Sequence, residues 1–317
     1  MKKEATLNTI NNKSLLKTMA AVALPIALQS LIGSSLNLVD NLMVGSLGEA
    51  ELNAVGVSVQ FYFVHWMLLY GFTSGTATFM AQYFGVKDFH NIRKTVGFAL
   101  TVTVSVSMLF FLTALIFPHY VLRIFTRFPE IIELGSGYVR ACAPAFLFTA
   151  VTVPFTSALR ATQQTRLPLY ISGAAFLTNT FLNYLLIFGS WGAPKLGVAG
   201  AALATMIARG LEMSLILYMV FGRKNKLCGP IREFFSYTKS SAVKIVKNAV
   251  PTTINETMWG LGTSLYVAAF ARIGVTEGAA VQACSTINNL FIMAAFSIGD
   301  ATLILVGQKL GEGKLDY

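Results

Sequence analysis

The chain has 317 residues, of which 55% are hydrophobic and only 12% are charged. Soluble domains carry about 25% charged residues, so a soluble fold of this size would lack the charges to cover its surface, and the same apolar composition excludes disorder. The three cysteines are scattered and the histidines number only three, which gives neither a disulfide framework nor zinc-ligand spacing. The composition therefore predicts a membrane protein, whose topology has to explain the net charge of +10.

Eight apolar segments, each long enough to cross a bilayer as a helix, follow one another along the chain. Their approximate limits are 18–44, 53–82, 95–117, 141–159, 167–189, 196–221, 248–271 and 278–308. None shows the alternating pattern of an outer-membrane barrel strand, and the first 17 residues are polar, so we expect no cleaved targeting peptide. The predicted fold class is all-α, a polytopic membrane protein with eight transmembrane helices present.

The lysine and arginine residues predict the orientation of these helices, because such residues accumulate in short cytoplasmic loops. With a cytoplasmic N-terminus, the inner segments carry a net charge of +13 and the outer segments a net charge of −1. The basic residues therefore reflect topology, they do not share one surface, and nucleic acid is not an expected partner. We expect a multi-pass protein of the plasma (bacterial inner) membrane with its N-terminus in the cytoplasm.

The longest basic stretch, residues 223–247, also contains Phe234, Phe235 and Tyr237. Basic and aromatic residues together favour an amphipathic segment that lies along the inner membrane interface, in contact with membrane lipid. This stretch divides the chain into an amino-terminal six-helix lobe at residues 1–222, a cytoplasmic linker at 223–247, and the first two helices of an incomplete second lobe at 248–317.

A weak internal repeat is the reason to expect a second lobe. A shift of 226 residues aligns the first two predicted helices with the seventh and eighth without a gap. The identical pairs include Pro25 and Pro251, Gln82 and Gln308, and Gly85 and Gly311. Six helices separate equivalent positions of the two copies, and an even number of spans gives both copies the same orientation in the membrane. The repeat is therefore parallel, of the kind found in some secondary transporters. We expect twelve helices in two six-helix bundles, with this chain truncated after the eighth; the alternative is a complete eight-helix protein with a chance match.

Polar side chains within the apolar segments need a reason, because a charge at mid-membrane costs about 2.5–3.5 kcal/mol on insertion scales. The first helix carries a polar stripe at steps of three and four that includes Asn37 and has Asp40 as its only charge. Asn179 and Asn183 share one face of the fifth helix, and Thr205 lies among small residues of the sixth. These oxygen groups suit Na⁺, and the carboxylate could alternatively bind a proton. Helix–helix hydrogen bonding would account equally well for the two asparagines.

Other ionisable residues lie in the later helices. Glu256 is in the seventh helix, with Tyr266 on a similar face. In the register of the repeat, the acids of the two lobes lie at different depths in the membrane. Arg209 and Glu212 are three apart on the sixth helix, so we expect them to form an ion pair. Asp300 lies in the eighth helix and the pattern assigns it no role.

Several motifs, in their order and spacing, resemble the multidrug and toxic compound extrusion (MATE) family. They are Pro25-Ile-Ala-Leu-Gln-Ser30, Val39-Asp-Asn-Leu-Met-Val-Gly45, Leu159-Arg-Ala-Thr-Gln163, Asn179-x₃-Asn183-Tyr-Leu-Leu-Ile-Phe-Gly189 and Gly197-x₂-Gly-Ala-Ala-x-Ala-Thr205. The resemblance runs from about residue 15 to the end. It implies two six-helix bundles that form a V, and export of cationic amphiphilic compounds driven by a cation.

The resemblance also assigns roles to particular residues. The amino-lobe cation site of the family falls on Asp40, Asn179, Asn183 and Thr205. Asn183 stands where one branch has a second aspartate, so the chain looks like the NorM-type branch, in which Glu256 is the second-lobe coupling candidate. Candidates for lining the substrate cavity are Gln29, Asn37 and Tyr266.

The sequence therefore predicts an alternating-access antiporter that exports small organic cations in exchange for Na⁺ or H⁺, has no cofactor, is not an enzyme, and is monomeric when full length. One alternative is a lipid-linked oligosaccharide flippase, which needs a cavity rich in basic residues; Arg140 and Arg209 are the only buried cationic candidates. Alternatives of another class are an intramembrane enzyme, although HExxH and GxSG motifs are absent, and a membrane receptor.

Overall fold

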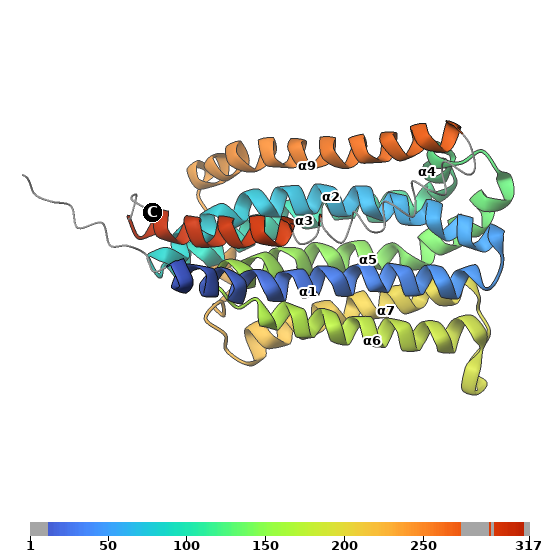
Figure 1. Cartoon of the computed structure of the whole chain (residues 1–317), viewed down its shortest axis with the longest axis horizontal. Coiled ribbons are helices and arrows are strands. Elements are labelled where there is room, and N and C mark those ends of the chain that lie inside the picture. The colour runs from blue at the N-terminus through green and yellow to red at the C-terminus, as the bar shows by residue number, and fades with distance from the viewer. Residues whose placement is uncertain (1–11, 274–291, 293–294, 314–317) are drawn as a thin grey trace, which may run out of the picture.

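The computed structural model describes residues 12–273, 292 and 295–313, with side-chain surroundings for residues 17–262, 292 and 295–313. In this part of the chain every regular element is a helix, as the sequence predicts, and the long helices run roughly along one axis (Figure 1). They are α1 (Asn12–Gly45), α2 (Glu49–Gly85), α3 (Phe89–Ile116), α5 (Pro129–Ala161), α6 (Arg166–Phe188), α7 (Val198–Leu217) and α9 (Lys239–Ile273). Two short helices, α4 (Pro118–Phe125) and α8 (Ile231–Phe234), join them, and residues 295–311 form a further helical segment.

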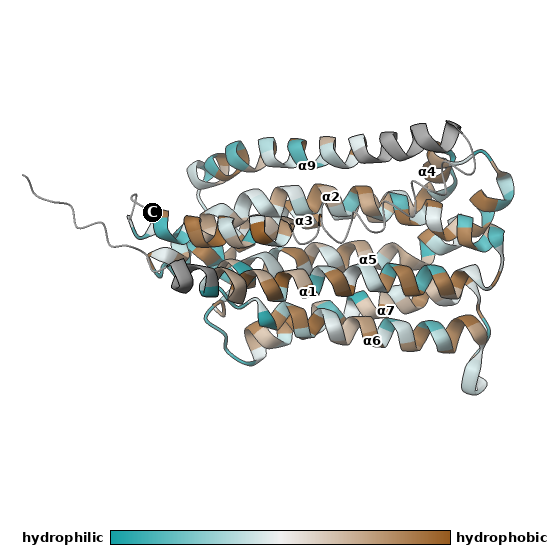
Figure 2. Cartoon of the chain, viewed as in Figure 1, coloured by the Kyte–Doolittle hydropathy of each residue, from teal (hydrophilic) through white to brown (hydrophobic). Residues whose placement is uncertain are grey.

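Within the described residues, six helices are long and apolar enough to cross a membrane: α1, α2, α3, α5, α6 and α7, the last with the π-helical turn that follows it. They correspond to the first six predicted spans. Helix α9 covers the seventh and has 35 residues, but it carries more polar residues and is paler and more teal than its neighbours in Figure 2. Much of the predicted eighth span lies outside the described residues. The chain is a multi-pass helical membrane protein.

The predicted loop at 118–139 is largely helical in the structure. Helix α4 begins at Pro118 and α5 at Pro129, and proline favours the first helical position because its missing N–H would be unpaired there in any case. Helix α5 therefore starts well before the predicted span at 141–159. The prediction of a buried Arg140 is wrong, because this side chain lies on an exposed face of α5.

The segment after α7 turns back onto the bundle through α8. Phe234 of α8 is buried, whereas its neighbour Phe235 is exposed, so this part of the predicted linker is amphipathic. The backbone of Phe234 lies so close to Gly97 of α3 that a Cβ atom at position 97 would overlap it. Helix α9 then begins at Lys239, inside the segment predicted as the linker.

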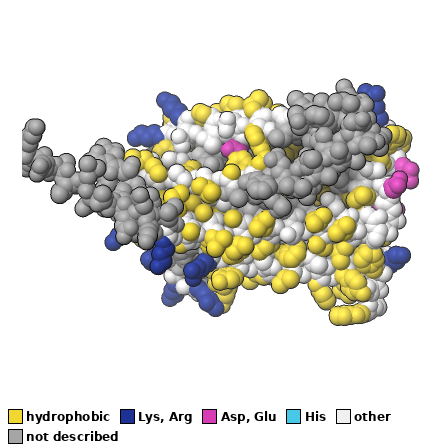
Figure 3. Space-filling model, in the orientation of Figure 1, with side chains coloured by type: hydrophobic (Ala, Val, Ile, Leu, Met, Phe, Trp, Pro, Cys, Tyr) yellow, Lys and Arg dark blue, Asp and Glu magenta, His cyan; other side chains and the backbone are white. Residues whose placement is uncertain are grey.

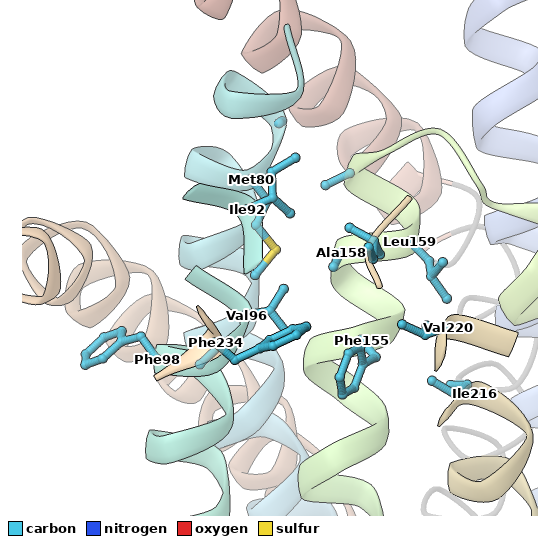
Figure 4. Close-up of a cluster of buried hydrophobic side chains, with 14 of the residues drawn as sticks. Met80, Ile92, Val96, Phe98, Phe155, Ala158, Leu159, Ile216, Val220 and Phe234 are labelled. Carbon is cyan, nitrogen blue, oxygen red and sulfur yellow. The ribbon is translucent and has the colours of Figure 1, made fainter. Parts of the chain in front are cut away.

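The largest hydrophobic cluster lies where α2, α3, α5, the end of α7 and α8 meet (Figure 4). Met80, Ile92, Leu159 and Val220 are essentially inaccessible to solvent in this cluster. Phe155 packs against Phe234 with ring centroids 6.1 Å apart. The cluster thus fixes the segment around α8 to the same end of the amino-terminal lobe at which α2 and α5 end.

The contacts between α2 and the segment 295–311 have the reciprocity that the internal repeat requires. A Cβ atom at Gly85 would lie 2.1 Å from the carbonyl oxygen of Gln308, and one at Gly311 would lie 2.0 Å from that of Gln82. Because each of these pairs is identical under the 226-residue shift, the repeat maps one contact onto the other. This reciprocity is what a pseudo-two-fold relation between the two copies of the repeat would produce, and the division into two lobes stays a prediction.

Candidate functional site

The four residues predicted to bind a cation come together from three helices of the amino-terminal lobe. Asp40 is on α1, Asn179 and Asn183 are on α6, and Thr205 is on α7. The two asparagines are four residues apart, so the helical period places both on the face of α6 that packs into the lobe, and both are fully buried. We refer to these four residues as the Asp40 group.

A hydrogen-bonded chain joins the Asp40 group. The amide nitrogen of Asn183 donates to Oδ1 of Asp40 and, over 3.0 Å, to Oδ1 of Asn179. The amide nitrogen of Asn179 lies 3.4 Å from Oγ1 of Thr205. The structure thus brings the four predicted side chains together, and their role in binding a cation stays a prediction.

One atom of the Asp40 group has no partner. Oδ1 of Asn183 is buried and accepts no hydrogen bond among the described residues. A buried acceptor without a partner costs free energy, which most proteins avoid. An unpaired amide oxygen beside a carboxylate is a suitable ligand for a hard cation, which prefers oxygen ligands. The residues present thus fit a Na⁺ ion, and the Asp40 carboxylate also fits a proton.

The Asp40 group is bordered by a hydrophobic cluster, by the phenol of Tyr138, which is hydrogen-bonded to Thr205, and by one positive charge. Tyr138, Cys142 and Ile187 belong to the hydrophobic cluster beside it. Arg209 lies within electrostatic range of Asp40, but its guanidinium donates to Oε2 of Glu212 over 2.8 Å. The predicted Arg209–Glu212 ion pair is confirmed. The only neighbouring cation described here is thus shared with another carboxylate.

The remaining predicted site residues do not join the Asp40 group. Gln29 is half-buried between α1, α5 and α6, and Asn37 lies on an exposed face of α1. Glu256 of α9 packs against Gly71 of α2. Tyr266 falls within α9, but its side chain lies outside the described residues.

A second polar cluster was not predicted from the sequence. Arg160, at the end of α5, forms an ion pair with Asp300, with 3.2 Å between Nη1 and Oδ2. Tyr70 of α2 donates to Oδ1 of Asp300 over 3.3 Å. The predicted spans place Arg160 in a cytoplasmic loop between 141–159 and 167–189. Arg160 also belongs to the motif Leu159-Arg-Ala-Thr-Gln163, which carries part of the family resemblance. Only the placement of residues 295–311 against α5 reveals the pair.

A third charged group fixes the segment around α8 outside the spanning helices. Glu233 accepts hydrogen bonds from Nε and Nη2 of Arg93 on α3, over 2.7 and 2.8 Å, and also contacts His90. The hydrogen bonds from Arg93 hold the pKa of the Glu233 carboxyl below its ordinary value of 4.5. Arg93 also donates to the carbonyl oxygen of Cys228. This arrangement is a structural clasp rather than a transport site.

Comparison with known proteins relates this architecture to transporters. A family model described as MatE matches residues 25–185 and 249–316. The chain is 26% identical over 308 residues to the probable multidrug resistance protein YoeA of Bacillus subtilis (strain 168), covering 96% of this chain and 66% of that protein. A probable multidrug resistance protein NorM of Thermotoga maritima is 24% identical over 304 residues, covering 95% and 64%. The chain thus spans just under two thirds of the length of these curated relatives.

Solved structures show the same fold. An outward-facing multidrug resistance MATE family transporter of the MOP superfamily superposes with a TM-score of 0.84 at 20% identity, covering 94% of this chain and 65% of that one. A MOP superfamily transporter from Pyrococcus furiosus, whose binding pocket of reversed polarity suggests a different function, gives the same TM-score, identity and coverage.

Proposed function

The chain belongs to the MatE family, and we propose that it exports cationic amphiphilic compounds in exchange for Na⁺ or H⁺. Members of this family are transporters rather than enzymes. In the proposed cycle the coupling ion binds at the Asp40 group, and its different affinity for two conformations of the lobes drives alternating access. No bond in the substrate is made or broken, and no cofactor is needed.

The observation that carries this proposal is the make-up of the Asp40 group. Asp40 is a half-buried carboxylate on the spanning helix α1, and it makes no ion pair among the described residues. Its hydrogen-bond partner, Asn183, holds an unpaired oxygen. A carboxylate in an apolar environment has a high free energy unless it meets a cation, a proton or fixed dipoles. Binding and release of a cation here would change both the charge and the hydrogen bonding of α1.

The balance of charge within the bundle supports a cationic substrate. Two of the interior acids, Glu212 and Asp300, are paired with arginines. Asp40 and Glu256 have no such partner in the part of the chain that the structure describes. The excess of negative charge favours organic cations and disfavours the pyrophosphate of a lipid-linked oligosaccharide, which would require unpaired basic residues.

The MOP superfamily transporter from Pyrococcus furiosus shows that this fold does not by itself fix the substrate. Its reversed pocket polarity suggests a different function for that protein. For this chain the substrate class therefore rests on the charges named above and not on the fold. Glu256 is the proposed second coupling residue, and Asn37 and Gln29 are proposed contributors to the path, with Tyr266 in the same role.

We place the protein in the plasma (bacterial inner) membrane with a cytoplasmic N-terminus, acting as a monomer. On the face in Figure 3, lysine and arginine side chains gather chiefly at the end where α1 begins, and the middle of the molecule is mostly apolar. Basic residues favour the cytoplasmic side, so this distribution supports the proposed orientation. The apolar middle would contact membrane lipid.

Transport by the product of the complete gene, reconstituted in liposomes, tests the proposal. Export of ethidium should follow an imposed Na⁺ or pH gradient and should stop when that gradient is collapsed. The anionic dye carboxyfluorescein, in place of ethidium, should not be moved. Ethidium movement that responds to neither gradient would refute ion coupling, and preferential transport of the anion would refute the substrate class.

A further inference from the structure

The Asp40 group is one layer of a longer polar seam along the amino-terminal lobe. Gln29 and Asp40 are eleven residues apart on α1, which is close to three helical turns, so they share a face. Ser172 lies seven residues before Asn179 on α6, again on the same face. Helix α7 carries Thr205 and, within two turns, Glu212. The same three helices therefore contribute to both the Asp40 group and a second layer formed by Gln29, Ser172 and Glu212.

The second layer is hydrogen-bonded from end to end. Nη2 of Arg160 donates to Oε1 of Gln29 over 2.7 Å, and Nε2 of Gln29 donates to Oγ of Ser172 over 2.9 Å. Ser172 in turn donates to Oε1 of Glu212 over 2.9 Å. Oε2 of Glu212 accepts from Arg209, the cation that lies within electrostatic range of Asp40.

The direction of these hydrogen bonds is fixed by the charges at the two ends. Arg160 can only donate, so it must meet the oxygen of the Gln29 amide, which turns the amide nitrogen towards Ser172. An ionised Glu212 can only accept, so the Ser172 hydroxyl must donate to it. Hydrogen bonds aligned in one direction strengthen one another in a low-dielectric environment. Loss of the bond at either end would therefore weaken the others.

Arg160 connects this layer to the second lobe through Asp300. The ion pair spans 140 residues of sequence and joins α5 to the segment 295–311. Next to it, Nε2 of Gln163 donates to Gln308, and Nε2 of Gln308 donates to the carbonyl oxygen of Ala161. Among these contacts the pair of Arg160 and Asp300 alone carries charge, so it should contribute most to holding the lobes together.

We propose that Arg160 and Asp300 form an ion-pair latch between the two lobes, and that Gln29 and Ser172 couple this latch to the Asp40 group. The latch lies near the end of the bundle at which α1 begins, so its closure seals that end. The latch itself is independent of what is transported. Its coupling to Asp40 rests on the proposed function, because a coupling ion is what would change the state of Asp40.

The population of separated lobes can be measured by pulsed dipolar spectroscopy in the product of the complete gene. Spin labels at Tyr170→Cys on α6 and Val306→Cys in the segment 295–311 use exposed positions on the two sides of the latch. Both are introduced after replacement of Cys142, Cys228 and Cys284 by alanine. Asp300→Asn and Arg160→Gln should each raise the ratio of separated to closed molecules about tenfold, equivalent to about 1.4 kcal/mol.

Two variants calibrate this measurement. Tyr70→Phe removes one long hydrogen bond, 3.3 Å from a neutral donor to Asp300, and should raise the ratio only about twofold to threefold. Glu133→Gln breaks an exposed contact with His119, which does not cross between the lobes, and should leave the ratio unchanged. If Asp300→Asn and Arg160→Gln behave like Glu133→Gln at normal membrane levels, there is no latch.

Gln29→Leu tests the coupling separately. This change keeps the size of the side chain but breaks the hydrogen bonds to Arg160 and Ser172, while Asp40 and the ion pair stay in place. The ratio of separated to closed molecules should no longer respond to Na⁺ or pH as it does in the parent. A response equal to that of the parent would overturn the coupling but not the latch. A parent that responds to neither ion would refute the proposed ion coupling, and Asp300→Asn would still test the latch.

Discussion

The two layers of the polar seam use the same helices but leave different buried atoms without a partner among the described residues: an acceptor, Oδ1 of Asn183, in the Asp40 group, and a donor, Nε of Arg160, at one end of the second layer. In the Asp40 group a single charge faces neutral amides, and one buried amide oxygen has no partner. In the layer of Gln29, Ser172 and Glu212, the carboxylate accepts from both a hydroxyl and a guanidinium, and charges stand at both ends.

This difference separates a site that can accept a ligand from one that holds a shape. The polar atoms of the Asp40 group that lack partners would be stabilised by a bound cation, because they would become its ligands. The second layer has no buried oxygen without a partner among the described residues, so an added cation would have to break existing bonds. Mutations in the Asp40 group should therefore change ion binding itself, whereas mutations in the second layer should change how lobe separation responds to the bound ion.

The largest effect is expected for Asp40→Asn, which removes the only charge of the Asp40 group and keeps its shape. Ion-coupled export should fall by about a hundredfold or more, equivalent to about 2.7 kcal/mol. Ethidium efflux against Na⁺ concentration and pH, at matched membrane levels, measures this change. Glu133→Gln, at an exposed acid of α5, is the matched control and should transport normally. Normal efflux by Asp40→Asn would make Asp40 structural and remove the distinction between the layers.

The next largest effect is expected at the contact between the lobes. Gly85→Ala would place a Cβ atom 2.1 Å from the carbonyl oxygen of Gln308, so α2 and the segment 295–311 must separate, at a cost of roughly 1–3 kcal/mol. The matched control is Gly33→Ala on α1, where nothing lies within 4 Å and the change should instead stabilise the helix by about 0.5–1 kcal/mol. Thermal melting in detergent compares them. Equal shifts for both variants would mean that this contact is absent in solution.

A smaller effect is expected for Asn183→Ala. The change removes the bridge between Asp40 and Asn179 together with the unpaired oxygen, but no charge. The ion concentration for half-maximal export should rise about tenfold, with the maximal rate retained, since one neutral ligand is worth about 1.4 kcal/mol.

Thr180→Val on the same helix is the control for Asn183→Ala. It deletes a buried hydroxyl that also has no partner among the described residues and should leave the ion dependence unchanged. If both variants shift the half-saturating concentration equally, the effect comes from packing of α6 rather than from a ligand.

The smallest effect is expected at the clasp that Glu233 forms with Arg93. Because Glu233 lies outside the spanning helices, its substitution is a reference against which the effects within the bundle can be compared. Glu233→Gln should loosen residues 225–238 by about 1 kcal/mol, seen as about fivefold faster amide hydrogen exchange there. Because the pKa of Glu233 is lowered on folding, the stabilisation is present above pH 4.5 and is lost as pH falls through the folded value.

The variant Glu233→Gln should accordingly show no such pH dependence, once exchange rates are corrected for the intrinsic rate at each pH. Glu133→Gln, at an exposed acid of α5, should leave exchange in residues 225–238 as in the parent. If amide hydrogen exchange in the parent is already as fast as in Glu233→Gln at neutral pH, the clasp contributes nothing to the stability of residues 225–238.

The sequence alone predicted the features that depend on local spacing. Long apolar segments identified six spanning helices, and a four-residue step placed Asn179 and Asn183 on one face. A three-residue step predicted the pair of Arg209 and Glu212. These predictions hold because the helical period determines which side chains are neighbours on one helix, whatever the helix packs against.

Only the tertiary structure decided which helix faces meet. Arg160 bonds to Gln29 and Asp300 across 131 and 140 residues, and charge counting had placed it in a loop, whereas Arg140 proved to be exposed. Local spacing cannot predict such contacts, since each depends on how α1, α5 and the segment 295–311 dock against one another. The hydrogen bonds that close the second layer exist only because docking removes these groups from water and lipid, where an unpaired polar group is costly.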